Sequence, residues 1–314
     1  MKTSIQTLGA RADKRRIVVE MHEYLELTKP RVVSLIVFTA VVGMFLSTPV
    51  MVPWNILVLA TLGIALAAGS AAAINHLVEQ RSDALMARTR ARPLPTGHLS
   101  SRQAIVFAGC LGTMSMLVLV LGVNLLTAIL TFISLIGYSI IYTLFLKRRT
   151  PQNIVIGGAA GAAPPVLGWT AVTGEIASDA LLLFLIIFVW TPPHFWALAL
   201  YREQEYMKAE IPMLPVTHGA EFTRLYVLLY VILLAAVTLL PFATHMSGWI
   251  YLTGVVALNI GFLWFAWRLY RRYSDKLARR TFGYSIQYLA LLFALLLIDH
   301  YRVFITEALQ TALY

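Results

Sequence analysis

The sequence contains few charged residues. Only 13% of its 314 residues are Asp, Glu, Lys or Arg, whereas 59% are hydrophobic, and the mean hydropathy is +0.75. A soluble globular domain has roughly 25% charged residues, so this composition excludes an ordinary soluble protein. Three long segments, 32–78, 103–146 and 225–267, contain no charged residue at all. Their length predicts an all-α polytopic membrane helix bundle.

Cysteine is nearly absent, and so is a secretory leader. Cys110 is the single cysteine, which excludes a disulfide framework and a cysteine metal site. Because it falls in an apolar run, we expect a buried structural thiol. Residues 1–28 have charges of both signs and no apolar h-region, so we expect a cytoplasmic N-terminal tail that partly orders as a short surface helix. The acidic residues also disfavour a mitochondrial transit peptide, so a bacterial plasma membrane is expected.

The apolar segments predict nine membrane spans. Each charge-free segment is long enough for two spans of about 20 residues, with turns near 49–53, 122–124 and 245–248. Single spans are expected at about 152–172, 180–200 and 282–302. Together the spans predict one membrane domain, 29–305, followed by a C-terminal tail, 306–314.

Lys and Arg are concentrated between alternate spans. Of the 25 bases, 24 lie in five segments that nine spans place on one side of the membrane, and only Arg302 lies elsewhere. The positive-inside rule makes that side cytoplasmic, with the N-terminus inside and the C-terminus outside. Topology therefore explains the net charge of +10, and no nucleic-acid partner is expected. The five segments are 1–31, 76–102, 146–150, 201–224 and 268–280.

A polar stretch follows one of the most apolar runs of the chain. Asn75, Glu79 and Asp83 recur every four residues, which places three oxygen-bearing side chains on one face of a helix. Such a face can hold Mg²⁺, which takes oxygen ligands and is usually shared with substrate phosphates. Arg88 and Arg92 follow closely, and guanidinium groups bind phosphate well. A helix end with solvated charges has the same spacing, so the pattern by itself leaves both interpretations open.

Further candidate residues lie near the predicted cytoplasmic ends. Residues 27–31 include two cations beside a proline at the start of the first span. Lys147 and Arg148 belong to a basic turn, which either binds phosphate or anchors a span. His194 lies within the sixth span, in the aromatic run 190–196. An ionisable group inside a span is a functional candidate, although a packed core histidine fits the same pattern.

These motifs resemble the membrane-embedded prenyltransferases of the UbiA type. The polar stretch is similar to their first acidic motif, with Glu79 where Asp is usual. Other motifs resemble one branch, the protohaem IX farnesyltransferases (haem O synthases), over residues 27 to about 300. They include Leu27-Thr-Lys-Pro-Arg31, Trp190-Thr-Pro-Pro-His-Phe-Trp196, Glu205-Tyr206-x₂-Ala209-x-Ile211-Pro-Met-Leu-Pro215 and Ser285-x₂-Tyr288-Leu289.

The resemblance implies a reaction and roles for specific residues. The reaction is transfer of a farnesyl group from farnesyl diphosphate to a vinyl group of haem b, with addition of water, giving haem O and diphosphate. The implied catalytic residues and Mg²⁺ ligands are Asn75, Glu79, Asp83 and Glu205. The implied diphosphate-binding residues are Arg88, Arg92, Lys147 and Arg148. Candidates for contact with the haem acceptor are His76, His194 and Trp196. Implied partners are membrane lipids and a haem A synthase or terminal oxidase.

Two other functions fit parts of the sequence. A prenyltransferase acting on an aromatic or chlorin acceptor would share the diphosphate site and differ in its acceptor pocket. A transporter of an anionic metabolite could use the same cytoplasmic cations. Transporters usually bind their substrate near mid-membrane, whereas the carboxylates here lie at the predicted cytoplasmic ends, so the carrier is disfavoured.

Overall fold

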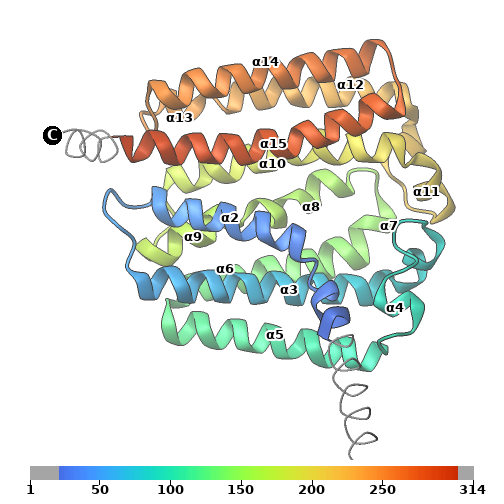
Figure 1. The fold of residues 1–314 in the computed structure, drawn as a ribbon, viewed down its shortest axis with the longest axis horizontal. Helices are drawn as coiled ribbons and strands as arrows, with labels where there is room; N and C mark the ends of the chain where they lie inside the picture. Colours follow the sequence, from blue (N-terminus) through green and yellow to red (C-terminus); the bar gives the residue numbers. More distant parts are fainter. Residues whose placement is uncertain (1–20, 303–314) are drawn as a thin grey trace, which may run out of the picture.

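The computed structural model describes residues 21–302, and every regular element in this range is helical (Figure 1). A short helix, Met21–Leu27, precedes the main bundle. The long helices are α2 (Pro30–Leu46), α3 (Trp54–Leu85), α5 (Ser101–Gly122), α6 (Leu125–Ile136), α8 (Asn153–Ala162), α9 (Pro164–Thr173), α10 (Ser178–Tyr201), α12 (Leu214–Val237), α14 (Trp249–Arg271) and α15 (Asp275–His300). The shorter elements are α4 (Pro93–Thr96), the π-helix η1 (Gly137–Leu146), α7 (Lys147–Arg149), α11 (Glu203–Lys208) and α13 (Leu240–Ala243).

The helices have the length and apolar character needed to cross a membrane. Within residues 21–302, eight helical segments meet this criterion, and Met21–Leu27 with α2, bent by 55°, makes a ninth. The predicted all-α bundle with about nine spans is therefore confirmed. Met21–Leu27 is the short helix expected in the N-terminal tail, whereas residues 1–20 and the predicted tail at 306–314 lie outside the described residues.

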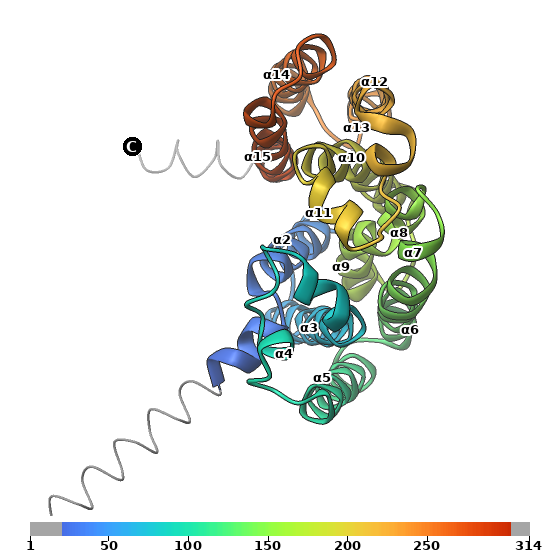
Figure 2. The same ribbon diagram turned by 90° about the vertical axis from the view of Figure 1, so that its right-hand side faces the viewer.

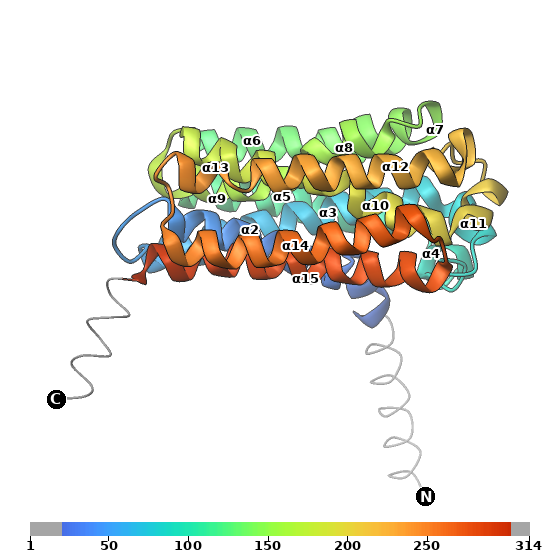
Figure 3. The same ribbon diagram turned by 90° about the horizontal axis from the view of Figure 1, so that it is seen from above.

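The short helices gather at one end of the bundle. Figures 1 and 3 show α4, α7 and α11 together at one end, and α13 with the α2–α3 connection at the other. Figure 2 looks onto the end formed by α4, α7 and α11. Bases predicted to be cytoplasmic lie in and around these three helices, so we call this the cytoplasmic end.

Helices α2 and α9 approach each other closely because glycine lies at both contact points. A Cβ on Gly43 would overlap the backbone of Pro165, and a Cβ on Gly168 would overlap the carbonyl oxygen of Ala40. Small residues allow membrane helices to gain packing contacts over their whole length, which is a main source of stability where no water is expelled. This contact fixes α2, and with it Lys29 at its start, against the rest of the bundle.

Cys110 on α5 is exposed, so the expectation of a buried thiol is wrong. Helix α5 packs mainly on α3, and its outer face exposes apolar side chains such as Leu117 and Leu121. An apolar sequence predicts burial only where the surrounding solvent is water. In a membrane the lipid is itself apolar, so an outward-facing thiol in an apolar run costs little.

Candidate active site

The cytoplasmic half of α3 buries the predicted polar face. Asn75, Glu79 and Asp83 are only 2%, 9% and 3% exposed. Helix α3 continues to Leu85, and the hydroxyl of Thr89 then donates to the backbone carbonyl of Asp83 at 2.9 Å. The spacing therefore forms one helical face as predicted, and that face points into the protein rather than to solvent.

Each oxygen of this face meets a base from a different element. Lys29, which precedes α2, donates to the side-chain carbonyl of Asn75, and Lys147 forms an ion pair with Glu79. Arg92 Nη1 lies 2.6 Å from the carboxylate of Asp83. Buried carboxylates require such partners because an unpaired charge in an apolar interior is costly. The structure thus brings the first acidic motif together with Lys147 and Arg92.

The other predicted phosphate-binding bases lie at the edge of this cluster. Arg148 Nη2 donates to Ser82 Oγ at 2.8 Å, which connects it to α3 between the two carboxylates. Arg148 also lines a cavity of about 310 Å³ between α3 and η1, together with Arg81 and Thr143. Arg88 is exposed just beyond α3.

Helix α11 brings the motif that begins with Glu205-Tyr206, which we call the second acidic motif, to the same end of the bundle (Figure 2). Its buried Tyr206 has a raised pKa, chiefly because burial disfavours the phenolate. Lys147 and Arg88 lower this pKa, whereas Glu79 and Glu205 raise it, so charges from both motifs act on one side chain. Residues far apart in sequence therefore share one electrostatic environment at the cytoplasmic end.

The four implied metal ligands do not contact one another as a group. Glu205 forms an ion pair with Arg202, which lies three residues before it in the sequence. Among residues 21–302, no three His, Cys, Asp or Glu side chains are grouped so as to hold a metal ion. The oxygen donors of α3 do fit a hard cation such as Mg²⁺ in chemical type and burial. The complete ligand set remains a prediction.

The π-helix η1 was not predicted from the sequence. It forms the last part of the predicted fourth span and ends directly before Lys147, the first residue of α7. Such π-helical turns often occur at functional sites. Tyr142 of η1 packs against Gly157, where a Cβ would overlap its ring. Thr143 accepts a 3.4 Å hydrogen bond from the Asn75 amide. No sequence signal pointed to Thr143.

Two more residues of the cluster were missed as contacts. Lys29 lies in a segment that the sequence singled out, yet its bond to Asn75 spans 46 positions and could not be read from spacing. Ser82 precedes Asp83 within the first acidic motif, and that position was the only available signal for it.

The two candidate histidines have different surroundings. His76 shares the face of Glu79 and Asp83 at helical spacing and is 1% exposed, and neither ring nitrogen has a hydrogen-bond partner. His194 on α10 stacks between Trp190 and Phe282, with ring centroids 4.3 and 4.5 Å away.

Trp196 lies on another face of α10 from His194. It is buried edge-on against Tyr226 and Tyr230 of α12, at centroid distances of 6.1 and 5.2 Å. Its ring nitrogen has no hydrogen-bond partner. The structure therefore does not bring Trp196 and His194 together in one aromatic cage.

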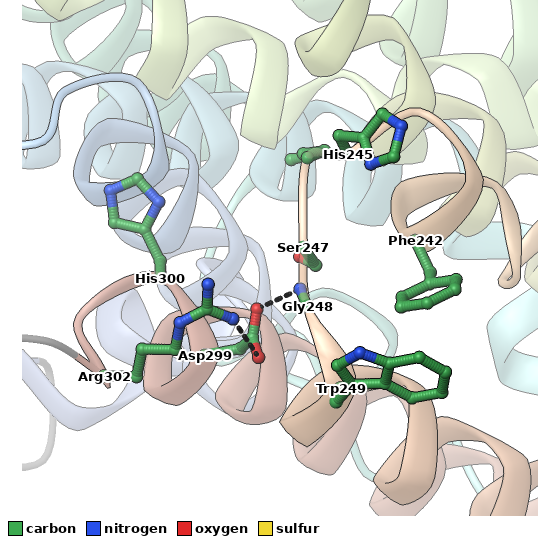
Figure 4. A pocket seen from close by; sticks show the side chains of 9 residues that line it. Phe242, His245, Ser247, Gly248, Trp249, Asp299, His300 and Arg302 are labelled. Atoms are coloured by element: carbon green, nitrogen blue, oxygen red, sulfur yellow. Dashed lines mark hydrogen bonds and ion pairs between the residues drawn. The ribbon is translucent and has the colours of Figure 1, made fainter.

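A larger cavity, of about 520 Å³, lies at the opposite end of the bundle beside α13. Figure 4 shows that Asp299 lies between the backbone amide of Gly248 and the guanidinium of Arg302. Asp299 also accepts a bond from the amide of Tyr251 at 3.3 Å, so it caps the start of α14. His300 is bonded to the carbonyl of Thr48 at 3.0 Å. These polar groups hold the helix ends together, and the predicted site residues lie elsewhere.

Comparison with known proteins decides the family. The model of the UbiA prenyltransferase family matches residues 36–297. The chain belongs to this family. It is 63% identical over 281 residues to the protoheme IX farnesyltransferase of Nitrosospira multiformis, covering 90% of this chain and 94% of that one. It is also 61% identical over 287 residues to the enzyme of the same name from Nitrosococcus oceani, covering 91% and 96%.

Solved structures of the UbiA family share the fold. One is described as digeranylgeranylglyceryl phosphate synthase and matches with a TM-score of 0.76 at 17% identity, over 90% of this chain and 99% of that chain. A UbiA homolog from Archaeoglobus fulgidus, bound to DMAPP and Mg²⁺, matches with a TM-score of 0.62 at 18% identity, over 87% and 99%. The family model and the apolar helices together make this chain a multi-pass membrane prenyltransferase.

Proposed function

We propose that this protein transfers a farnesyl group from farnesyl diphosphate to a vinyl group of haem b, giving haem O and diphosphate. The observation that carries the proposal is the buried face of α3, whose Glu79 and Asp83 are paired with Lys147 and Arg92. Carboxylates and bases in one buried cluster are the groups that a magnesium diphosphate needs. The names of the two relatives supply the choice of acceptor.

The reaction breaks the allylic carbon–oxygen bond of farnesyl diphosphate, and the bonding electrons leave with the diphosphate. The terminal vinyl carbon of haem b then forms the new carbon–carbon bond with the allylic carbon. Water adds to the neighbouring vinyl carbon and loses a proton. Lys147, Arg92 and Arg148 are placed to stabilise the leaving charge, because each now binds an oxygen that a diphosphate can replace.

Mg²⁺ would be held by the side-chain oxygens of Asn75, Glu79 and Asp83 on α3, and Glu205 of α11 would complete the set. When bound, Mg²⁺ supplies Lewis-acid stabilisation of the diphosphate. The bases that now pair with the carboxylates would turn to the phosphate oxygens, so that every buried charge stays compensated. The homolog from Archaeoglobus fulgidus, solved with DMAPP and Mg²⁺, supports the use of Mg²⁺ by this fold.

The membrane setting suits both substrates. Farnesyl and porphyrin groups are lipophilic, and a site between helices admits them from the bilayer while excluding water from the allylic cation. The basic cytoplasmic segments and the presence of acidic residues in the N-terminal tail favour a bacterial plasma membrane. An enzyme that modifies or binds haem O, such as a haem A synthase or terminal oxidase, would take the product.

Product mass tests the proposal directly. Membranes containing this chain are incubated with Mg²⁺ and farnesyl diphosphate, plus either haem b or 4-hydroxybenzoate. We expect a product of haem O mass in the first reaction and no prenylated acid in the second. If only prenylated acid formed, the acceptor would be an aromatic acid and not haem b. Membranes lacking this chain are the control.

A further inference from the structure

His194 is tied to α15 by a chain of hydrogen bonds. Its Nδ1 lies 2.6 Å from Ser285 Oγ, and Ser285 Oγ in turn donates to the carbonyl of Phe282 at 2.6 Å. Trp190 Nε1 donates to the carbonyl of Ser285 at 2.8 Å, so the ring stacked on His194 is tied to the same residue. The imidazole is therefore fixed on both faces and along one edge.

The hydrogen bond from Ser285 to Phe282 favours one tautomer of His194. A serine hydroxyl has one hydrogen, and that of Ser285 is used by the carbonyl of Phe282. In that arrangement Ser285 Oγ accepts from His194, and the ring hydrogen lies on Nδ1. A neutral imidazole with its hydrogen on Nδ1 has a free electron pair on Nε2, and this is the tautomer that coordinates a metal.

The environment of Nε2 differs from that of the nitrogens of His76. Nε2 of His194 has no hydrogen bond among the described residues, yet it is not one of the fully buried atoms without a partner. It therefore reaches accessible space. Both nitrogens of His76 are fully buried. Of the two candidates, His194 alone combines a fixed tautomer with a reachable nitrogen.

We propose that Nε2 of His194 is the axial ligand of the iron of the haem substrate, with Ser285 as the positioning residue that holds the tautomer. The proposal rests on haem b being the acceptor. It assigns the stacked rings of Trp190 and Phe282 the role of fixing the imidazole orientation. Coordination would hold the porphyrin in place while its vinyl group meets the farnesyl cation, and it requires no change in iron oxidation state.

Spectroscopy of bound haem tests this without turnover. Full-length protein in lipid nanodiscs is mixed with ferrous haem b in the absence of farnesyl diphosphate, and absorption and resonance Raman spectra are recorded. Wild-type protein should show an iron–histidine stretching band. The variant His194→Phe keeps an aromatic ring in the stack and removes both nitrogens. It should lose the band and bind haem b more than about tenfold more weakly.

His218→Phe is the matched control. His218 also stacks on an aromatic ring, that of Phe222, and its Nδ1 lies 2.8 Å from the hydroxyl of Thr217, but it is exposed. This variant should retain the wild-type spectrum. Ser285→Ala keeps the ligand and removes its hydrogen-bond acceptor, so the band should shift and affinity should fall by roughly 10- to 100-fold.

The outcomes separate this inference from the proposed function. If wild-type protein makes haem O and His194→Phe keeps the iron–histidine band, His194 is not the ligand although the reaction stands. Should His194→Phe fail to fold, an unshifted band in Ser285→Ala overturns the assignment. A wild-type protein that binds haem b without a histidine signature also overturns it. Failure to bind haem b or to make haem O would reject the proposed function itself.

Discussion

The two ends of the bundle satisfy buried carboxylates in different ways. At the cytoplasmic end, Asp83 and Glu79 are paired with Arg92 and Lys147, which are side chains from other elements. At the opposite end, Asp299 accepts hydrogen bonds from backbone amides at the start of α14, in addition to its ion pair with Arg302. A side-chain base can rotate to a ligand, whereas a backbone amide cannot move unless the helix end unfolds. We infer that only the cytoplasmic arrangement is suited to exchange partners with a substrate.

The strongest test of this comparison neutralises one carboxylate at each end. Asp83→Asn should lower farnesyl transfer by about 100- to 1,000-fold, because it removes a carboxylate that would hold the Mg²⁺ that stabilises the departing diphosphate. Turnover is measured as haem O by mass spectrometry, and thermal unfolding confirms that the variant is folded.

Asp299→Asn is the counterpart at the other end. It should leave turnover within about twofold of wild type and lower stability by about 1 kcal/mol, because the start of α14 loses a charged cap. Equal losses of turnover in the two variants would show that the ends do not differ in function.

A smaller effect is expected from changing one base of the α7 turn. Lys147→Gln should reduce farnesyl transfer by roughly 10- to 100-fold, the value of a hydrogen bond to a charged group. Arg149→Gln should have almost no effect, because Arg149 is exposed and its guanidinium lies over Phe145, 5.5 Å from the ring centroid. Initial rates of the two variants are compared at saturating haem b. Similar losses of rate would mean that both residues act only as membrane anchors.

Between the two ends, a pair of glycines tests packing alone. Gly168→Ala should destabilise the protein by about 1–3 kcal/mol, because the added Cβ overlaps the backbone of Ala40. Gly161 has nothing within 4 Å of an added Cβ. Gly161→Ala should therefore be neutral or stabilising by up to about 1 kcal/mol. Thermal unfolding in detergent measures both, and a stable Gly168→Ala protein would contradict the close α2–α9 contact.

The smallest expected effect concerns pH. Because the pKa of Tyr206 is raised in the folded protein, its contribution to stability is present below the unfolded value of 10.0 and is lost as pH rises above it. Tyr206→Phe should lessen the loss of stability between pH 9 and 11, which is about one unit either side of the unfolded pKa. Unfolding midpoints across this range provide the measurement. Identical pH profiles would mean that Tyr206 is not buried in the way described.

Local periodicity explains why part of the site could be predicted. Asn75, Glu79 and Asp83 fall on one face of any helix through that segment, whatever surrounds it. The bases of alternate loops likewise fall on one side once the number of spans is known. Cys110 shows where this reasoning fails, because a hydrophobic run does not tell which side of a helix meets lipid.

The sequence by itself determined the spans and the oxygen-bearing face of α3, because these depend on helix geometry and on the cost of charge in a membrane. Only the tertiary structure decided that Lys147 meets Glu79, that η1 becomes a π-helix, and that Ser285 fixes the ring of His194 from 91 residues away. Such pairings depend on how whole helices pack against one another. No spacing within a single helix encodes them.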